Sequence, residues 1–137
     1  MNEQQPATAG TADHAGVPRM RAIRGATTLE QDSREQALMR TQELLGEIFR
    51  RNELDQDDVV SILFTATDDV SGAYPAEAAR EAGFNLVPLL CARELEIEGG
   101  IPLCIRVLLH VQTTRTPAEL RHVYLHDARQ LRTDLPE

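Results

Sequence analysis

The chain has 137 residues, including 14 arginines and 22 acidic side chains, and its formal net charge is -8. This length suits one domain with a hydrophobic core, but not two such domains. The acidic balance argues against a nucleic-acid-binding protein, because such proteins usually present a basic patch. The sequence contains no lysine, so any anion site must use arginine or backbone N–H groups.

Residues 1–18 are rich in Ala, Gly, Thr, Gln and Pro, a composition typical of a disordered tail. The segment lacks the basic and apolar regions of a signal peptide, and no apolar run in the chain approaches the length of a membrane span. We therefore expect a cytoplasmic protein that binds no membrane. Its two cysteines, Cys91 and Cys104, are expected to be reduced thiols.

The first predicted elements are a short strand over residues 20–23, a helix over 32–52 and a strand over 59–67. Asp32 is the expected N-cap of the helix, with Glu35 completing a capping box. The strand over 59–67 is a near-continuous apolar run, which is typical of a strand covered on both faces. One stripe of the helix is apolar at helical spacing and consists of Ala37, Leu38, Thr41, Leu44, Leu45, Ile48 and Phe49.

The remaining predicted elements are a short helix, two strands, one helical turn and a last strand, over residues 75–83, 84–91, 101–113, 116–120 and 121–131. The short helix has Pro75 in its first turn and Gly83 at its end. Pro88 places the next strand at a sheet edge or a bulge. This order predicts an α+β fold in which one sheet is covered by helices, without internal repeats.

Arg106 interrupts the apolar strand IPLCIRVLLHVQT. Strand side chains alternate between two faces, and one face is purely aliphatic: Ile101, Leu103, Ile105, Val107, Leu109 and Val111. Arg106 lies on the other face beside Cys104 and Leu108, where a guanidinium requires an anion. Two interpretations stay open, an internal salt bridge and a site for an anionic ligand.

Four further polar residues stand at the ends of predicted strands or on the last one. Arg24 follows the first strand, Cys91 and Glu94 lie at the end of the third, and Tyr124 lies on the last. Each has an ordinary explanation, since loop arginines and glutamates are usually solvated and cysteine is often a small buried hydrophobe. A buried tyrosine, however, needs a partner for its hydroxyl.

The histidines do not predict a metal site. His122 and His126 share one face of the last predicted strand, but four strand residues separate them by about 13 Å, which is too far for shared ligation. The sequence also lacks a phosphate loop and the GxGxxG and GxSxG motifs. We therefore expect neither a metal nor an organic cofactor.

Six motifs resemble those of the AroH-type chorismate mutases in order and spacing: MRAIRGATT, LFTATDD, YPAEAAREAG, VPLLCARELEIEGG, CIRVLLHVQT and RHVYL. The resemblance spans residues 19–132 and leaves 1–18 and 133–137 as tails. It implies a homotrimer that forms a pseudo-α/β barrel with a mixed sheet, and active sites in the clefts between chains. The implied reaction converts chorismate to prephenate, a Claisen rearrangement on the shikimate route to phenylalanine and tyrosine.

The same resemblance implies roles for individual residues. Arg106 would face the ether oxygen of chorismate, Glu94 would hold the ring hydroxyl, and Tyr124 would close on the side-chain carboxylate. Arg24 would bind a carboxylate from across a chain boundary. The other implied substrate-binding residues are Tyr74 and Ala76 in the wall, Arg80 near the entrance, Leu89, Leu90 and Cys91 on the third strand, and Leu131, which shares the mobile C-terminal segment with Arg132.

Glu77 departs from the family pattern, which has lysine after FPA where this chain reads YPAE. A carboxylate that points into the cleft would repel a dianionic substrate. Glu77 and Arg80 are three residues apart on the predicted helix, so we expect them to pair on its outer surface.

The physical chemistry of the implied reaction agrees with these residues. Chorismate is a dianion, which gives converging arginines on an acidic protein a function. The rearrangement moves no proton, so it requires a reactive conformer and a fixed positive charge for the electron density that grows on the ether oxygen. Two alternatives stay open: an imine deaminase on a similar trimeric scaffold, and a dicarboxylate-binding protein without turnover.

Overall fold

The computed structural model describes residues 16–132. The tails predicted over residues 1–18 and 133–137 lie outside this range, apart from residues 16–18, which belong to no helix or strand. Between residues 16 and 132, no helix combines the length and the apolar character that crossing a membrane requires.

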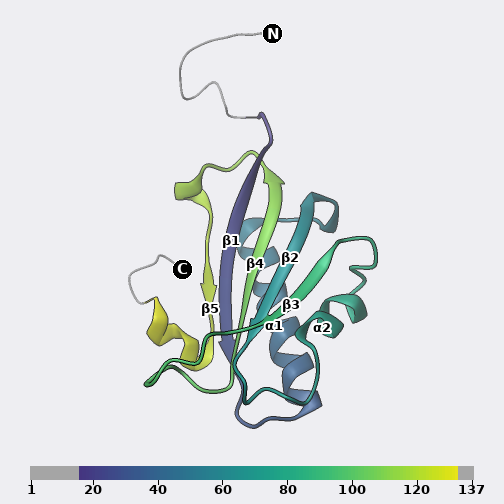
Figure 1. Cartoon of the computed structure of the whole chain (residues 1–137). Coiled ribbons are helices and arrows are strands. Elements are labelled where there is room, and N and C mark those ends of the chain that lie inside the picture. The colour runs from purple at the N-terminus through teal and green to yellow at the C-terminus, as the bar shows by residue number, and fades with distance from the viewer. Residues whose placement is uncertain (1–15, 133–137) are drawn as a thin grey trace.

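Five strands form one mixed sheet in the order β3-β2-β4-β1-β5 (Figure 1). Their bounds are β1 Arg19–Thr28, β2 Val59–Ala66, β3 Leu89–Arg93, β4 Cys104–Thr113 and β5 Val123–Tyr124. β4 runs antiparallel to both β1 and β2, whereas β3 joins β2 and β5 joins β1 in parallel. The predicted α+β fold is confirmed, and β3 lies at an edge, as Pro88 indicated.

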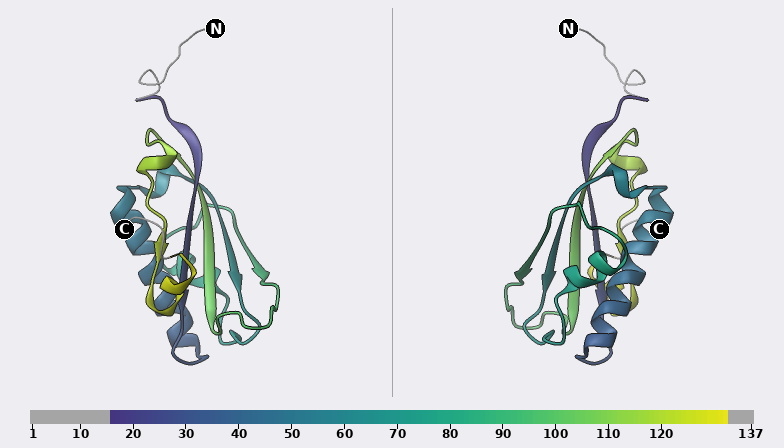
Figure 2. Two further views of the ribbon diagram at one scale, coloured as in Figure 1. Left: turned by 90° about the vertical axis from the view of Figure 1, so that its left-hand side faces the viewer. Right: turned by 90° about the vertical axis from the view of Figure 1, so that its right-hand side faces the viewer.

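Both α-helices cover the same side of the sheet (Figure 2). α1 (Arg34–Asn52) packs on β1 and β5, and α2 (Pro75–Glu81) packs on β2, β3 and α1. The predicted apolar stripe of α1 is buried or half-buried. It meets core side chains of the sheet: Ile23, Ile62, Phe64, Val107, Leu109 and Val111.

Besides the last strand, three strands differ by more than one residue from their predicted bounds. β3 covers Leu89–Arg93 rather than residues 84–91. β1 continues beyond residues 20–23 to Thr28, because it pairs with β4 along its whole length. β4 begins at Cys104 rather than at residue 101, because Leu103 has a left-handed backbone, with φ of 51°, that interrupts the extended conformation.

The last strand predicted over residues 121–131 is wrong except at β5. His126 has φ of 55°, which an extended strand does not allow, and residues His126–Leu131 form a 3-10 helix. This 3-10 helix packs Ala128 against Ala26 and Cys104 at one end of the sheet. The alternation of apolar residues predicted a strand there, because that pattern gives no sign of the turn at His126.

The N-cap of α1 is Ser33, not Asp32 as predicted. The Ser33 hydroxyl accepts from the backbone N–H of Gln36 at 3.1 Å. Asp32 accepts instead from the backbone N–H groups of residues 71–72, at 2.8 and 3.0 Å. A Cβ on Gly72 would lie 2.6 Å from the backbone nitrogen of Arg34, so only glycine allows this close approach.

The other face of the sheet carries no helix in residues 16–132, except at the end that the 3-10 helix covers. The strand register aligns two rows of side chains on this open face. The first row consists of Arg24, Leu108, Leu63 and Leu90, and the second of Ala26, Arg106, Thr65 and Ala92. Arg106 therefore lies on the face opposite the core, as its position in the strand predicted.

Candidate functional site

Two hollows adjoin at the end of the sheet where β2 and β3 finish and β4 begins. The first, of about 450 Å³, is lined by residues 67–69, 94–97, 100–102 and Arg106. The second, of about 590 Å³, is lined by residues 64–68, 70–75, 77 and 91–93. Both include Thr67 and Asp68, so one connected surface joins β2, the loop after it and β3.

Arg106 and Glu94 form an ion pair in the first hollow. Arg106 Nε lies 2.8 Å from Glu94 Oε2, and the two side chains are 45% and 13% exposed. The hydroxyl of Thr65 donates to the same Oε2 atom, also at 2.8 Å. The internal salt bridge left open by the sequence is therefore present.

The ion pair engages only part of the Arg106 guanidinium and of the Glu94 carboxylate. Among the described residues, Glu94 Oε1 accepts no hydrogen bond, and Arg106 has no ion-pair partner besides Glu94. A guanidinium has five N–H donors, so the pair leaves donors and one carboxylate oxygen for a ligand. The salt bridge and the ligand site are thus compatible.

The sheet brings these groups together. Thr65 on β2 pairs directly with Arg106 on β4 and with Ala92 on β3. The backbone N–H of Glu94 donates to the carbonyl of Ala66 at 3.0 Å, which extends the β2–β3 pairing by one residue. Glu94 is therefore held by strand geometry, although it lies just beyond the strand.

A buried thiol lies next to this pair. Cys104 is fully buried, and burial, together with the Glu94 carboxylate, raises the pKa of the Cys104 thiol to about 11. The thiol is consequently protonated at neutral pH. It is neither a nucleophile nor an anion that competes for Arg106.

Asp69 holds the chain at the start of β4. Its carboxylate accepts from the backbone N–H of Leu103 at 3.0 Å and from the hydroxyl of Thr67 at 2.6 Å. Thr67 Oγ1 in turn accepts from the backbone N–H of Cys104 at 3.0 Å. These bonds stabilise the left-handed conformation of Leu103, which lies three residues before Arg106 in the chain.

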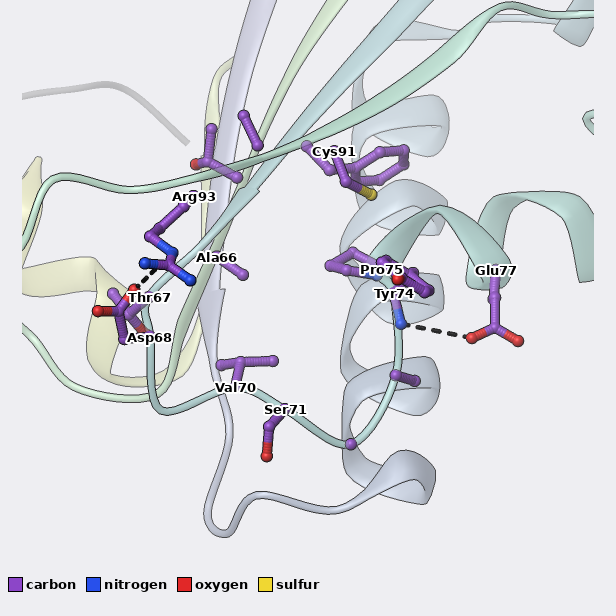
Figure 3. A pocket seen from close by; sticks show the side chains of 15 residues that line it. Ala66, Thr67, Asp68, Val70, Ser71, Tyr74, Pro75, Glu77, Cys91 and Arg93 are labelled. Carbon is purple, nitrogen blue, oxygen red and sulfur yellow. Dashed lines mark hydrogen bonds and ion pairs between the residues drawn. The ribbon is translucent and has the colours of Figure 1, made fainter.

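The second hollow holds the predicted residues Tyr74 and Cys91. Cys91 is half-buried, whereas the Tyr74 side chain is among the exposed large side chains, at 70%. Figure 3 shows Arg93 facing Asp68, its ion-pair partner at 3.1 Å, at one end of this hollow, with Glu77 at the other. The hollow thus has a charged boundary at each end.

Glu77 pairs with Arg34 rather than with Arg80, so the predicted partner is wrong. Arg34 Nη1 lies 3.0 Å from Glu77 Oε2, and the backbone N–H of Tyr74 donates to Oε1 at 3.3 Å. Arg34 is the first residue of α1, which packs beside α2. The i,i+3 spacing could not reveal a partner that only helix packing supplies. The Arg34 guanidinium therefore offsets the negative charge of Glu77 at the edge of the hollow.

Four predicted residues line neither hollow. Ala76 is a core side chain at 5% exposure, and Leu89 packs partly buried against the same core. Tyr124 and Leu131 pack partly buried in the small cluster that contains Cys104. Their predicted roles in substrate binding stay predictions.

Three other predicted residues are exposed outside both hollows: Arg24, Arg80 and Leu90. Arg24 and Leu90 lie on the open face of the sheet. Within residues 16–132 no ion pair holds the Arg24 or Arg80 guanidinium.

His122 supports the backbone at Arg24. The backbone N–H of Arg24 donates to His122 Nδ1 at 2.9 Å, which requires that this nitrogen carry no proton. Burial and the nearby guanidinium groups of Arg24 and Arg132 lower the pKa of His122. The neutral imidazole that the hydrogen bond needs is thus favoured.

Sequence reasoning missed Thr65, Asp69 and Arg34. Strand alternation in the motif LFTATDD could have placed Thr65 on the same sheet face as Arg106. Asp69 and Arg34 had no such signal, because each acts on a segment more than 30 residues away. In the described part of the chain, no cluster of three or more His, Cys, Asp or Glu side chains is placed to hold a metal ion.

Comparison with known proteins identifies the family of this chain. The family model described as chorismate mutase type I matches residues 20–135. Chorismate mutase AroH of Bacillus subtilis is 44% identical over 117 residues, covering 85% of this chain and 92% of that protein. The Thermus thermophilus protein of the same name is 43% identical, covering 85% and 96%. A chorismate mutase structure from Clostridium thermocellum superposes with a TM-score of 0.78 at 41% identity, covering 80% of this chain and 97% of the other. The chain belongs to the chorismate mutase type I family.

Proposed function

We propose that this protein converts chorismate to prephenate at the Arg106–Glu94 pair, without a covalent intermediate or proton transfer. The observation that carries the proposal is the pair itself, in which Nε and Oε2 are joined at 2.8 Å. This ion pair places the guanidinium in a hollow, where it has no second ion-pair partner among the described residues. Membership of the family supports the assignment of substrate and product.

Arg106 is suited to the charge that develops in the transition state. As the C–O bond of chorismate breaks, electron density grows on the ether oxygen, and a preorganised donor in a partly dry site stabilises it. Glu94 holds the guanidinium in place through Nε. Its free Oε1 accepts a hydrogen bond from the ring hydroxyl, which orients the substrate.

The second hollow accommodates the remainder of the substrate. It adjoins the first through Thr67 and Asp68, and Tyr74 and Cys91 contribute to its lining. Arg34 lies 3.0 Å from Glu77 and offsets its negative charge. A substrate carboxylate in this hollow therefore meets less repulsion than an unpaired Glu77 would cause. Arg80, at the end of α2, provides a further positive charge for the entrance.

The proposal includes a homotrimer in which Arg24 and Tyr124 act on the site of a neighbouring chain. An uncovered sheet face supports this assembly, because antiparallel and mixed sheets that expose leucines need a partner. Leu90 is 64% exposed on that face, and Leu63 and Leu108 lie beside it in one row. Arg24, whose guanidinium has no ion pair within residues 16–132, ends the same row.

Two measurements test the proposal. Purified protein mixed with chorismate should remove the enol-ether absorbance and form prephenate. An imine deaminase or a binding protein without turnover would leave chorismate unchanged. The rate should be nearly flat from about pH 6 to 9, because no step moves a proton. A bell-shaped kcat profile with a solvent isotope effect would contradict the pericyclic mechanism.

The shared site has its own test. Inactive Arg24→Ala and Arg106→Ala chains should regain part of the activity after subunit exchange, because some sites then combine two intact halves. Exchange without recovery would contradict completion of the site by a neighbour. The cytoplasmic location expected from the sequence stays a prediction, which cell fractionation can check.

A further inference from the structure

We infer that Thr65 is a positioning residue for this reaction, whose hydroxyl fixes the Glu94 carboxylate so that Oε1 stays free for the substrate. The inference rests on the proposed role of Glu94 in the site. Thr65 acts through Glu94 and needs no contact with the substrate.

The geometry places one hydroxyl donor and one guanidinium against the same carboxylate oxygen. Thr65 Oγ1 and Arg106 Nε each lie 2.8 Å from Glu94 Oε2. They approach from neighbouring strands, because Thr65 on β2 is the register partner of Arg106 on β4. A hydrogen bond from one strand and an ion pair from the next together define the orientation of the carboxylate, whereas the ion pair alone would leave it free to rotate.

The hydroxyl also prevents a competing arrangement. An arginine and a carboxylate readily form a bidentate pair with two parallel N–H···O bonds. In such a pair Glu94 would use both oxygens, and Arg106 would spend a terminal nitrogen that the ether oxygen needs. The Thr65 hydroxyl turns Oε2 toward both Thr65 and Arg106 Nε, which disfavours the rotation of the carboxylate that a bidentate pair requires. The Glu94 side chain is only 13% exposed, so water has little access to replace the hydroxyl.

The experiment compares Thr65→Val, which keeps the shape but loses the donor, with Thr65→Ser, which keeps the donor. Thr65→Val should lower kcat/KM about 10- to 100-fold, the range for a lost hydrogen bond to a charged group, with most of the loss in kcat. Thr65→Ser should stay within about twofold of the wild type. The matched control is Thr41→Val, since Thr41 on α1 is buried and its hydroxyl has no hydrogen-bond partner in the described part of the chain.

A double-mutant cycle shows whether Thr65 acts through Glu94. In a Glu94→Ala background, adding Thr65→Val should change kcat/KM by less than about twofold, because the carboxylate is already absent. Melting temperature and mass in solution are measured for every variant. If Thr65→Val does not fold, Thr65→Ala replaces it throughout.

Three results would overturn the inference. They are a folded Thr65→Val protein with wild-type kcat, a Thr65→Ser protein as impaired as Thr65→Val, and an undiminished Thr65→Val effect without Glu94. A different result would overturn the proposed site itself, namely full activity in Glu94→Ala. An impaired Glu94→Ala protein with an unaffected Thr65→Val protein refutes the positioning role alone.

Discussion

Replacing Arg106 by alanine distinguishes a catalytic group from a structural salt bridge. The guanidinium is 45% exposed, and ion pairs of this exposure contribute at most about 1 kcal/mol to stability. The change leaves Glu94 without its charged partner but with the Thr65 hydroxyl still bound. We therefore expect a loss of about 1–2 kcal/mol in the free energy of unfolding, or about 3–8 °C in Tm.

The expected catalytic loss is larger. Removing one preorganised donor from a developing charge costs about 3–4 kcal/mol, or about 10²- to 10³-fold in kcat. A full positive charge should exceed the effect of a neutral donor, so kcat of Arg106→Ala should fall at least about 100-fold. Arg106→Lys should also be severely impaired, because one ammonium cannot bond Glu94 and meet the ether oxygen in the same geometry.

The assay measures kcat from the loss of chorismate absorbance, and Tm and mass in solution on the same samples. Arg50→Ala is the control, since Arg50 pairs with Glu47 at 2.7 Å on the exposed face of α1. This variant should keep wild-type kcat. A folded Arg106→Ala protein with wild-type assembly, lowered Tm and near-normal kcat would refute the mechanism and leave a structural salt bridge.

Three further predictions concern stability and reactivity. Thr41→Val should stabilise the protein by about 1 kcal/mol, because the buried hydroxyl has no partner within the described residues; a lower denaturant midpoint would contradict this. Peptide mapping after brief alkylation should find label on half-buried Cys91 but not on Cys104, whose burial raises its thiol pKa to about 11; equal labelling would be the contrary result. Because the pKa of His122 is lowered on folding, the unfolded state binds more protons, so stability should decrease as pH falls below about 6.5. His122→Gln should remove part of that slope in pH-dependent denaturation, and an unchanged slope would argue against it.

Much of the fold was accessible from local patterns. Helical spacing predicted the buried stripe of α1, and the apolar run after residue 58 predicted β2 to within one residue at its end. The alternation of side chains along the predicted strand assigned Arg106 to the sheet face opposite the core. Pro88 indicated an edge for β3. These predictions succeed because burial on one face imposes a period on neighbouring residues.

The candidate site was accessible in part. Motif spacing identified Arg106 and Glu94, and the structure brings them to 2.8 Å. Motif spacing did not reveal Thr65, because a threonine in an apolar strand gives the same sequence pattern whether or not its hydroxyl forms a hydrogen bond. Nor did it resolve whether Arg106 serves a salt bridge or a ligand, since that depends on which atoms of the pair are occupied.

The sequence by itself determined the family, the order of most elements and the face that carries the arginine, since each depends on residues close together in the chain. Tertiary structure alone decided the partner of Glu77, the use of Asp32 by the loop at residues 71–72, and the left-handed turn at Leu103. Each of these depends on a polar group meeting a segment tens of residues away. Such encounters depend on the packing of helices and strands against one another, which no local period encodes.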